Sequence, residues 1–210
     1  MPGGAASMRR VARREVLHEL SSVDHALYEA IARVPTPVLD RQMRRLSQAA
    51  NRSVIWLGIA AGLAAFGGGA GRRAAVRGTA AIGVTSALVN IGIKSLHDRP
   101  RPDRAGLKVP VGRHVPMPAS RSFPSGHSAS GFAFAGAVGH ELPWLALPLR
   151  FLAAAVAYSR VHTGVHYPGD AVAGSIVGGS AGQAVTSLFD RTGRPSPASA
   201  ADHVTHRSPR

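Results

Sequence analysis

Five stretches of the chain consist almost entirely of apolar and small residues, and the charged residues gather between them. These stretches cover residues 54–70, 74–93, 129–138, 145–158 and 171–189. A helix that crosses a bilayer needs roughly 20 predominantly apolar residues, with a range of about 17–25. The first, second and fifth stretches reach this length, whereas the third and fourth are shorter. We therefore expect an all-α, helical-bundle integral membrane protein with about five transmembrane helices; a soluble bundle of unusually apolar helices is the alternative.

The fifth stretch carries three glycines at a spacing of four residues, Gly174, Gly178 and Gly182. In a helix this spacing places all three on one face. Small residues repeated in this way allow two helices to approach closely in lipid. The pattern predicts close packing of this stretch against another helix.

Residues 22–50 mix apolar and charged positions with a helical period, and two prolines divide them. The apolar series before and after Pro35 and Pro37 are Val23, Leu27, Ile31 and then Leu39, Met43, Leu46. Two such series indicate two amphipathic helices. We expect them to lie on the membrane surface with the arginines of residues 41–45 toward the headgroups. Two ordinary helices packed on a soluble core are the alternative.

The remaining segments contain few apolar residues. Residues 1–21 are basic and polar, and residues 191–210 are rich in Pro, Ser and Ala, so we expect both to be disordered tails. They flank the amphipathic segment, residues 22–50, and a membrane domain, residues 51–190. No apolar run follows the arginines near the N-terminus, so we expect no signal peptide. Residues 94–128 form a long Pro- and Arg-rich loop, which is typical of a functional segment.

The composition of the chain points to an anionic partner. Its formal net charge is +14, from 25 Lys and Arg against 11 Asp and Glu. Such an excess attracts nucleic acid, anionic lipid headgroups or phosphorylated substrates. Nucleic acid is disfavoured because 45% of the residues are hydrophobic and only 5% are aromatic, which leaves few stacking platforms. The chain has no cysteine, which excludes thiol nucleophiles and zinc–thiolate sites.

Two groups of residues near the long loop are suited to holding a phosphate. Lys94 ends the second apolar stretch, and Arg101 follows closely; an Arg fork and a Lys point charge both bind phosphate oxygens. Ser125, Gly126 and His127 open the third apolar stretch, where the free N–H groups of a helix N-terminus attract anions. Each group alone also fits an ordinary role, as cations at a membrane edge or as a serine cap with a surface histidine.

A third group contains an imidazole and a carboxylate at a short spacing. Arg160 is followed by His166 and Asp170, which flank a Tyr-Pro-Gly turn. A carboxylate that accepts the Nδ1 proton of an imidazole leaves Nε2 free to attack an electrophile. A metal site at His162, His166 and Asp170 is the alternative. It is disfavoured because the cations of the neighbouring loops would repel a metal ion.

Together these residues resemble the signature of the type 2 phosphatidic-acid phosphatase superfamily, which includes bacterial acid phosphatases and vanadium haloperoxidases. The family pattern is Lys, six residues, Arg-Pro; then Pro-Ser-Gly-His; then Ser-Arg, five residues, His, three residues, Asp. The chain matches it at every position from Lys94 to Asp170. The resemblance extends over about residues 55–190, and three motifs in the right order and spacing make it specific.

The resemblance implies a division of labour among these residues. It makes His166 the nucleophile that forms a phosphohistidine, His127 the group that protonates the leaving oxygen and then activates water, and Asp170 the group that orients His166. It assigns the phosphoryl oxygens to five further residues: Lys94, Arg101, Ser125, Gly126 and Arg160. It requires no metal ion and no cofactor.

The apolar stretches favour the membrane branch of this family. The resemblance then implies hydrolysis of a phosphate or diphosphate monoester of a lipid, of the phosphatidic acid, phosphatidylglycerophosphate or polyprenyl-phosphate type. The Ala, Gly and Arg richness resembles actinobacterial members, for which a polyprenyl-phosphoryl-phosphoribose phosphatase of cell-wall arabinan synthesis is an alternative. A non-catalytic protein that binds anionic lipids is another. The expected partners are a lipid phosphate and membrane lipids, with no nucleic acid.

Charge predicts the orientation of the chain in a bacterial plasma membrane. The Arg-rich residues 1–53 favour a cytoplasmic N-terminus. With five spans, the loops that hold all three motifs then face the cytoplasm. Arg72 and Arg73, on the opposite side, argue mildly against this orientation.

Overall fold

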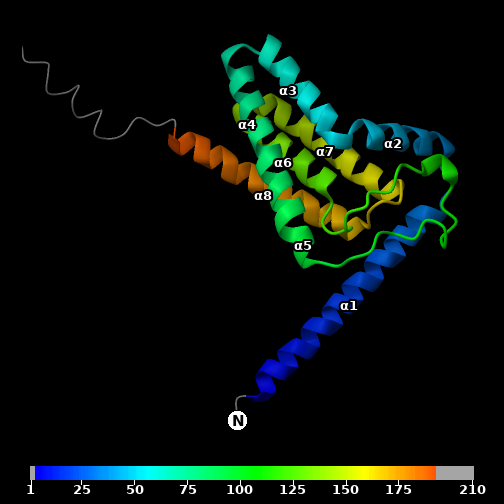
Figure 1. The fold of residues 1–210 in the computed structure, drawn as a ribbon. Coiled ribbons are helices and arrows are strands. Elements are labelled where there is room, and N and C mark those ends of the chain that lie inside the picture. Colours follow the sequence, from blue (N-terminus) through cyan, green and yellow to red (C-terminus); the bar gives the residue numbers. More distant parts are fainter. Residues whose placement is uncertain (1–2, 193–210) are drawn as a thin grey trace, which may run out of the picture.

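The computed structural model describes residues 3–192, and every regular element in that range is helical (Figure 1). The expectation of an all-α fold is confirmed for this part of the chain. The α-helices are α1 (Gly3–Arg33), α2 (Pro37–Ala49), α3 (Val54–Phe66), α4 (Gly68–Ala87), α5 (Lys94–Leu96), α6 (Gly126–Glu141), α7 (Pro143–His162) and α8 (Pro168–Thr192). Shorter turns are the 3-10 helices η1 (Asn51–Ser53) and η3 (Val111–Arg113), and the π-helix η2 (Leu88–Ile93).

Each of the five apolar stretches forms a helix, but within residues 3–192 fewer helices than expected are long and apolar enough to be candidate membrane spans. Two helical segments are long and apolar enough to cross a membrane, residues 68–96 and helix α7. Helices α2 and α3 together could form a third span, bent by 62°. Five spans are therefore not confirmed.

Helix length and composition explain the difference. Helix α3 has 13 residues and α6 has 16, which at a rise of about 1.5 Å per residue gives roughly 20 and 24 Å. The hydrocarbon core of a bilayer is about 30 Å thick. Helix α8 has 25 residues but interrupts its apolar positions with Gly, Ser, Gln and Thr. Continuous apolar sequence predicted the helices correctly, but not which of them are long and apolar enough to cross.

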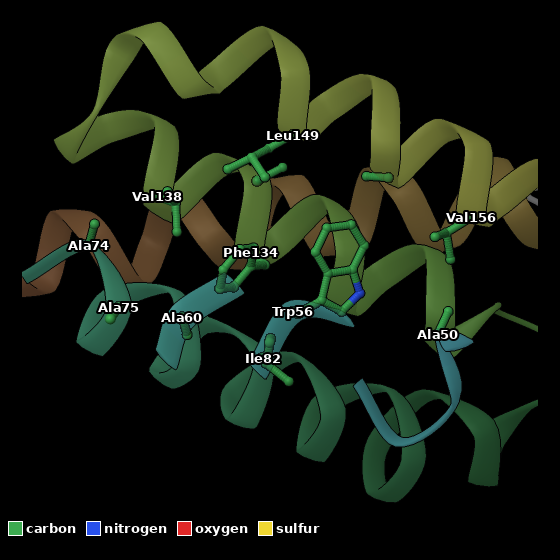
Figure 2. Packing of buried hydrophobic residues seen from close by; sticks show 12 residues of the cluster. Ala50, Trp56, Ala60, Ala74, Ala75, Ile82, Phe134, Val138, Leu149 and Val156 are labelled. Atoms are coloured by element: carbon green, nitrogen blue, oxygen red, sulfur yellow. The ribbon is translucent and has the colours of Figure 1, made fainter. Parts of the chain in front are cut away.

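Helix α6 lies at the centre of the bundle, with α4, α7 and α8 around it (Figure 1). Its Phe134 is fully buried and packs against Trp56 of α3, with ring centroids 5.5 Å apart (Figure 2). The rest of this core consists mainly of alanine and branched aliphatic residues from α3, α4, α6 and α7. These small side chains bring the helices close together. The C-terminal ends of α4 and α7 then lie at the same end of the bundle as the N-terminal ends of α6 and α8.

Helix α8 packs on α6 through the predicted glycine face. A Cβ atom at Gly174, Gly178 or Gly182 would lie closer than 3.0 Å to a carbonyl oxygen of Ser125, Ala129 or Ala133 respectively. Real Cβ atoms essentially never approach another atom so closely. The backbones therefore touch along three turns, and the N–H of Ser125 donates to the carbonyl of Asp170 at 2.9 Å. This contact fixes the first turn of α6 against the first turn of α8.

Residues 3–21 correct the expectation of a disordered tail, because they form the first part of α1. The reason is intrinsic propensity: residues 5–34 contain Ala, Arg, Leu and Glu, with neither Gly nor Pro. The predicted break at the prolines is present, since α1 ends at Arg33 and α2 begins at Pro37. Helix α1 projects away from the bundle and contacts it near its C-terminal end (Figure 1). The second predicted tail lies outside the described residues from position 193 onward.

A buried ionic cluster holds the N-terminal helices on the bundle. Arg113, in η3, is fully buried and donates from Nε to Asp40 of α2 at 2.8 Å, and from Nη1 to the carbonyl of Ile31 at 2.9 Å. His162, at the end of α7, lies 2.8 Å from the same Asp40 oxygen. The carboxylate of Asp40 thus joins α2, η3 and α7, and Arg113 ties the end of α1 to the same cluster.

The glycine contact predicts a difference between two neighbouring positions of α8. Gly178→Ala should lower stability by about 1–3 kcal/mol, because the methyl group overlaps the backbone of α6. Gly179→Ala is the matched control, since nothing lies within 4 Å of its Cβ position. It should raise stability by roughly 0.5–1 kcal/mol through helix propensity. Melting in detergent checks both; equal melting temperatures for the two variants would contradict the contact.

Candidate active site

A cavity of about 240 Å³ opens where the ends of the helices meet. Its lining includes residues from all three sequence motifs. They are Lys94, Arg101, Gly126, His127 and His166. Its remaining wall is Ala50, Arg52, Ser53, Trp56, Ser86, Asn90, Pro118, Ser120 and Ser130. Residues predicted from three separated parts of the chain thus share one site.

The backbone is unusual at two edges of this cavity. Arg52 and Ser53, between α2 and α3, have φ values of 52° and 61°. Non-glycine residues in this left-handed region cost of order 1–3 kcal/mol each and cluster at functional sites. The π-helix η2 directly precedes Lys94, and π-helical turns are also frequent at such sites. The left-handed turn places Arg52 and Ser53 at the cavity, and the π-helix does the same for Lys94.

His166 and Asp170 form the predicted imidazole–carboxylate pair. The Nδ1 atom of His166 lies 3.5 Å from Oδ2 of Asp170, and both side chains are almost completely buried. This contact is long, as catalytic hydrogen bonds often are before substrate binds. On the other side of the ring, Nε2 accepts a hydrogen bond from Nη1 of Arg101 at 3.2 Å. The ring is therefore oriented with a proton on Nδ1 and a lone pair on Nε2.

Burial keeps this imidazole neutral. Desolvation lowers the pKa of His166 to about 4, and the positive charge of Arg101 acts in the same direction. The hydrogen bond with Asp170 raises the pKa and offsets only part of this effect. At neutral pH the side chain is thus an uncharged base, which a nucleophile must be.

The carboxylate of Asp170 is held by groups that the motif does not include. Its Oδ2 accepts hydrogen bonds from the Ser122 hydroxyl and, at 2.9 Å, from the N–H of Tyr167. Its Oδ1 accepts from Nη1 of Arg99 at 2.9 Å. Sequence reasoning missed Ser122 and did not distinguish Arg99 from other loop arginines. Their only signal was a position close to the motif residues.

The two predicted cations at the cavity wall are fixed by oxygen atoms of the long loop and, for Arg101, also of the turn between α7 and α8. Arg101 donates from Nη1 to the carbonyl of Val165 at 2.6 Å and from Nε to the carbonyl of Ser120 at 2.8 Å. Lys94 donates to the hydroxyl of Ser120 at 3.2 Å. Neutral partners leave both positive charges uncompensated, so the cavity attracts an anion.

His127 is oriented by a residue far away in the sequence. Its Nε2 lies 3.1 Å from Oδ1 of Asn51, which follows α2. An amide oxygen can only accept, so the Nε2 of His127 carries the proton. The two residues are 76 positions apart, and no spacing rule connects them. Asn51 was therefore not among the expected site residues.

Ser125 and Arg160 lie behind the cavity wall. Ser125 is fully buried, and its hydroxyl accepts from the N–H of Ser128 to cap α6. Arg160 is 1% exposed and donates from Nη1 to the Ser47 hydroxyl at 2.6 Å. Its Nε has no hydrogen-bond partner among residues 3–192. Of the eight predicted site residues, these two and Asp170 do not line the cavity.

The alternative metal site is not assembled. His162 turns away from His166 and contacts Asp40, as described above. Within the described part of the chain, no group of three or more His, Cys, Asp or Glu side chains could hold a metal ion.

A family model matches more than half of the chain, and a curated relative is similar to part of it. The model described as the PAP2 superfamily matches residues 74–194. Decaprenylphosphoryl-5-phosphoribose phosphatase of Mycobacterium tuberculosis is 38% identical over 96 residues, which are 46% of this chain and 51% of that protein. The chain thus spans about half the length of the curated relatives it matches.

Two solved structures resemble the fold over most of its length. LpxE of Aquifex aeolicus has a TM-score of 0.63 and 26% identity, covering 76% of this chain and 92% of its own. A transmembrane PAP2-type phosphatidylglycerolphosphate phosphatase of Bacillus subtilis has a TM-score of 0.65 and 23% identity, covering 85% and 90%. The helical bundle is thus similar to those of membrane phosphatases.

The burial of His166 predicts its titration. In the NMR spectrum of protein labelled in histidine, its resonances should keep the neutral position down to about pH 5, whereas an unperturbed imidazole titrates near pH 6.5. The spectrum of His166→Ala assigns the signal. As the pH drops, His166 binds a proton in the unfolded chain before it does so in the folded protein. The free energy of unfolding should therefore decrease as the pH drops from about 6.5 towards 4. A midpoint at 6.5 or above would contradict a desolvated ring.

Proposed function

Because the chain belongs to the PAP2 superfamily, we propose that it is a membrane lipid phosphatase that hydrolyses a phosphate or diphosphate monoester without a metal ion. One observation supports this most directly. The neutral imidazole of His166 offers Nε2 to a cavity whose walls carry Lys94, Arg101 and a second imidazole, His127. A nucleophile, an acid–base group and fixed cations are the requirements of phosphoryl transfer by electrostatic stabilisation.

The proposed reaction has two steps. In the first, Nε2 of His166 attacks phosphorus, a P–N bond forms, and the bond from phosphorus to the lipid oxygen breaks. His127, protonated to the imidazolium form beside the bound anionic phosphate, gives the leaving oxygen its additional proton and becomes neutral. In the second, His127 removes a proton from water, the water oxygen attacks phosphorus, and the P–N bond breaks. Inorganic phosphate leaves and His166 returns to its neutral form.

The remaining residues stabilise the charge that develops on the phosphoryl oxygens. Arg101 and Lys94 reach the cavity directly, and the N–H of Gly126 lies at the positive end of α6. Ser125 shapes this turn by capping it. Arg160 acts from behind the wall, where its unpartnered Nε and its buried charge strengthen the field.

A polyprenyl-phosphate type of substrate is favoured among the lipid phosphates. The support is the 38% identity with a decaprenylphosphoryl-5-phosphoribose phosphatase. Phosphatidic acid and phosphatidylglycerophosphate are the other members of the substrate panel. Trp56 and Ala50 add apolar surface to the cavity beside the cations, which suits a headgroup attached to a hydrocarbon chain.

We place the protein in the bacterial plasma membrane with its active site toward the cytoplasm. The cavity opens at the bundle end where α3 begins, next to the Arg-rich segment that precedes it. The positive-inside rule assigns such a segment to the cytoplasmic side. This argument depends on which bundle end carries the charge and not on the number of spans.

The proposed function is tested by phosphate release in detergent from a panel of lipid phosphates. Wild-type protein should release phosphate in EDTA and should be inhibited by vanadate, which mimics the five-coordinate transition state. His166→Ala should abolish turnover, and His127→Ala should lower it by about 10²–10⁴-fold. His140→Ala is the matched control, because His140 lies at the far end of α6, 48% exposed and next to Asp190.

Three outcomes would contradict the proposal. Activity that persists in His166→Ala would remove the nucleophile. Activity lost in EDTA and restored by a divalent cation would establish a metal mechanism. Retention of lipid phosphates on the protein without release of phosphate would identify a non-catalytic binder of anionic lipids.

The orientation is tested by single cysteines, which the natural chain lacks. Val111→Cys lies in the loop at the cavity end and is 78% exposed. Gly69→Cys lies at the opposite end, where the nearest atom to its Cβ is 3.8 Å away. In intact spheroplasts an impermeant maleimide should label position 69 and spare position 111. The reverse pattern would place the active site on the outer face.

A further inference from the structure

Helix α1 lies outside the region that matches the family model, yet one of its carboxylates reaches the active site. Asp24 is 9% exposed, and its Oδ2 accepts from Nη2 of Arg99 at 2.6 Å. Its Oδ1 accepts from the N–H of Gly169 at 2.6 Å, in the first turn of α8. Asp24, which is distant in sequence, is therefore hydrogen-bonded both to Arg99 and to the backbone of Gly169, directly before Asp170.

Arg99 is the link between the two carboxylates. Its two terminal nitrogens diverge, with Nη2 on Asp24 and Nη1 on Oδ1 of Asp170 at 2.9 Å. The guanidinium also lies over the ring of Tyr167, 4.4 Å from its centroid. Two ion pairs and one stacking contact leave this side chain a single arrangement. The contacts run continuously from Asp24 through Arg99 and Asp170 to His166.

We propose that Asp24 is a positioning residue for catalysis, which shares Arg99 with Asp170 and so sets how Asp170 orients and charges His166. The proposal builds on the proposed function for its kinetic consequences, while its structural consequences stand without it. Asp24 touches neither the cavity nor the reacting atoms, so it acts only through Arg99 and Gly169.

The charges explain why a second carboxylate is needed. Arg99 alone would neutralise Asp170 and weaken the acceptance of the Nδ1 proton of His166. Asp24 shares that positive charge, which leaves more of the negative charge of Asp170 available to the imidazole. Asp170 is fully buried, and the side chains of Asp24 and Arg99 are only 11% and 23% exposed, so screening by water is reduced and these interactions are stronger than on the open surface. The negative charge that remains available on Asp170 matters most when His166 becomes cationic on attacking phosphorus.

Gly169 offers a way to disturb Asp24 without removing its charge. A Cβ at this position would lie 2.8 Å from Oδ2 and 3.2 Å from Cγ of Asp24. The backbone of Gly169 has no positive φ, so alanine is compatible with this first turn of α8. The methyl group of Gly169→Ala would therefore push the Asp24 carboxylate aside.

The experiment compares Asp24→Asn and Gly169→Ala with Glu29→Gln. Glu29 is the matched control because it lies on α1, is partly exposed, and pairs with Arg33 of the same helix. Asp24→Asn should lower kcat by about 10–100-fold, the cost of a misplaced catalytic group. The KM should change less than about twofold. Gly169→Ala should lower kcat in the same direction, and the double variant should be no worse than Asp24→Asn, because both changes act through one carboxylate.

A spectroscopic readout makes the test independent of turnover. The Nδ1 proton of His166, assigned with His166→Ala, should move upfield in Asp24→Asn and Gly169→Ala as its bond to Asp170 weakens. It should stay in place in Glu29→Gln. An unmoved resonance in folded Asp24→Asn protein would overturn the proposal even if wild-type protein hydrolyses nothing. With an active wild type, kcat equal to that of Glu29→Gln would also overturn it.

Discussion

The backbone contact between α6 and α8 is the constraint on which the site depends. Three glycines let α8 lie directly on the carbonyl oxygens of α6. The contact starts at Ser125 and Asp170, whose backbones are hydrogen-bonded. It therefore sets the distance between the helix start that carries His127 and the turn that carries His166. If larger side chains at the three glycine positions held α6 and α8 further apart, no rearrangement of the loops could restore this distance.

Burial of charge is the second theme, and the two buried carboxylates Asp40 and Asp170 are matched by charged partners before any substrate is present. Asp40 receives Arg113 and contacts His162, and Asp170 receives Arg99 together with hydroxyl and amide donors. Unpaired charges of this kind would be too costly to bury. The cations at the cavity wall differ, because their partners are neutral oxygens. Positive charge is thus concentrated where the phosphate is proposed to bind.

The sequence predicted local features better than long-range ones. Apolar runs predicted α3, α4, α6, α7 and α8, and the motif spacings correctly brought five residues to one cavity. The second half of α1 was predicted, but its extension over residues 3–21 was missed because basic composition was given more weight than helix propensity. The contacts of Asn51 with His127 and of Asp24 with Gly169 join positions 76 and 145 residues apart. Such pairs leave no periodic or spacing signal, since only the folded chain brings them together.

The fixed cations at the cavity have a consequence for the end of the catalytic cycle. Lys94 and Arg101 are held in place by hydrogen bonds to Ser120 and, for Arg101, to Val165, so little conformational entropy remains to be lost when an anion binds. Inorganic phosphate carries the same oxygens as the substrate headgroup and meets the same prearranged field. In the proposed reaction such a site binds its product as well as its substrate, so we expect the departure of phosphate to limit turnover. The turnover of the protein would follow the phosphate concentration on the side to which the cavity opens.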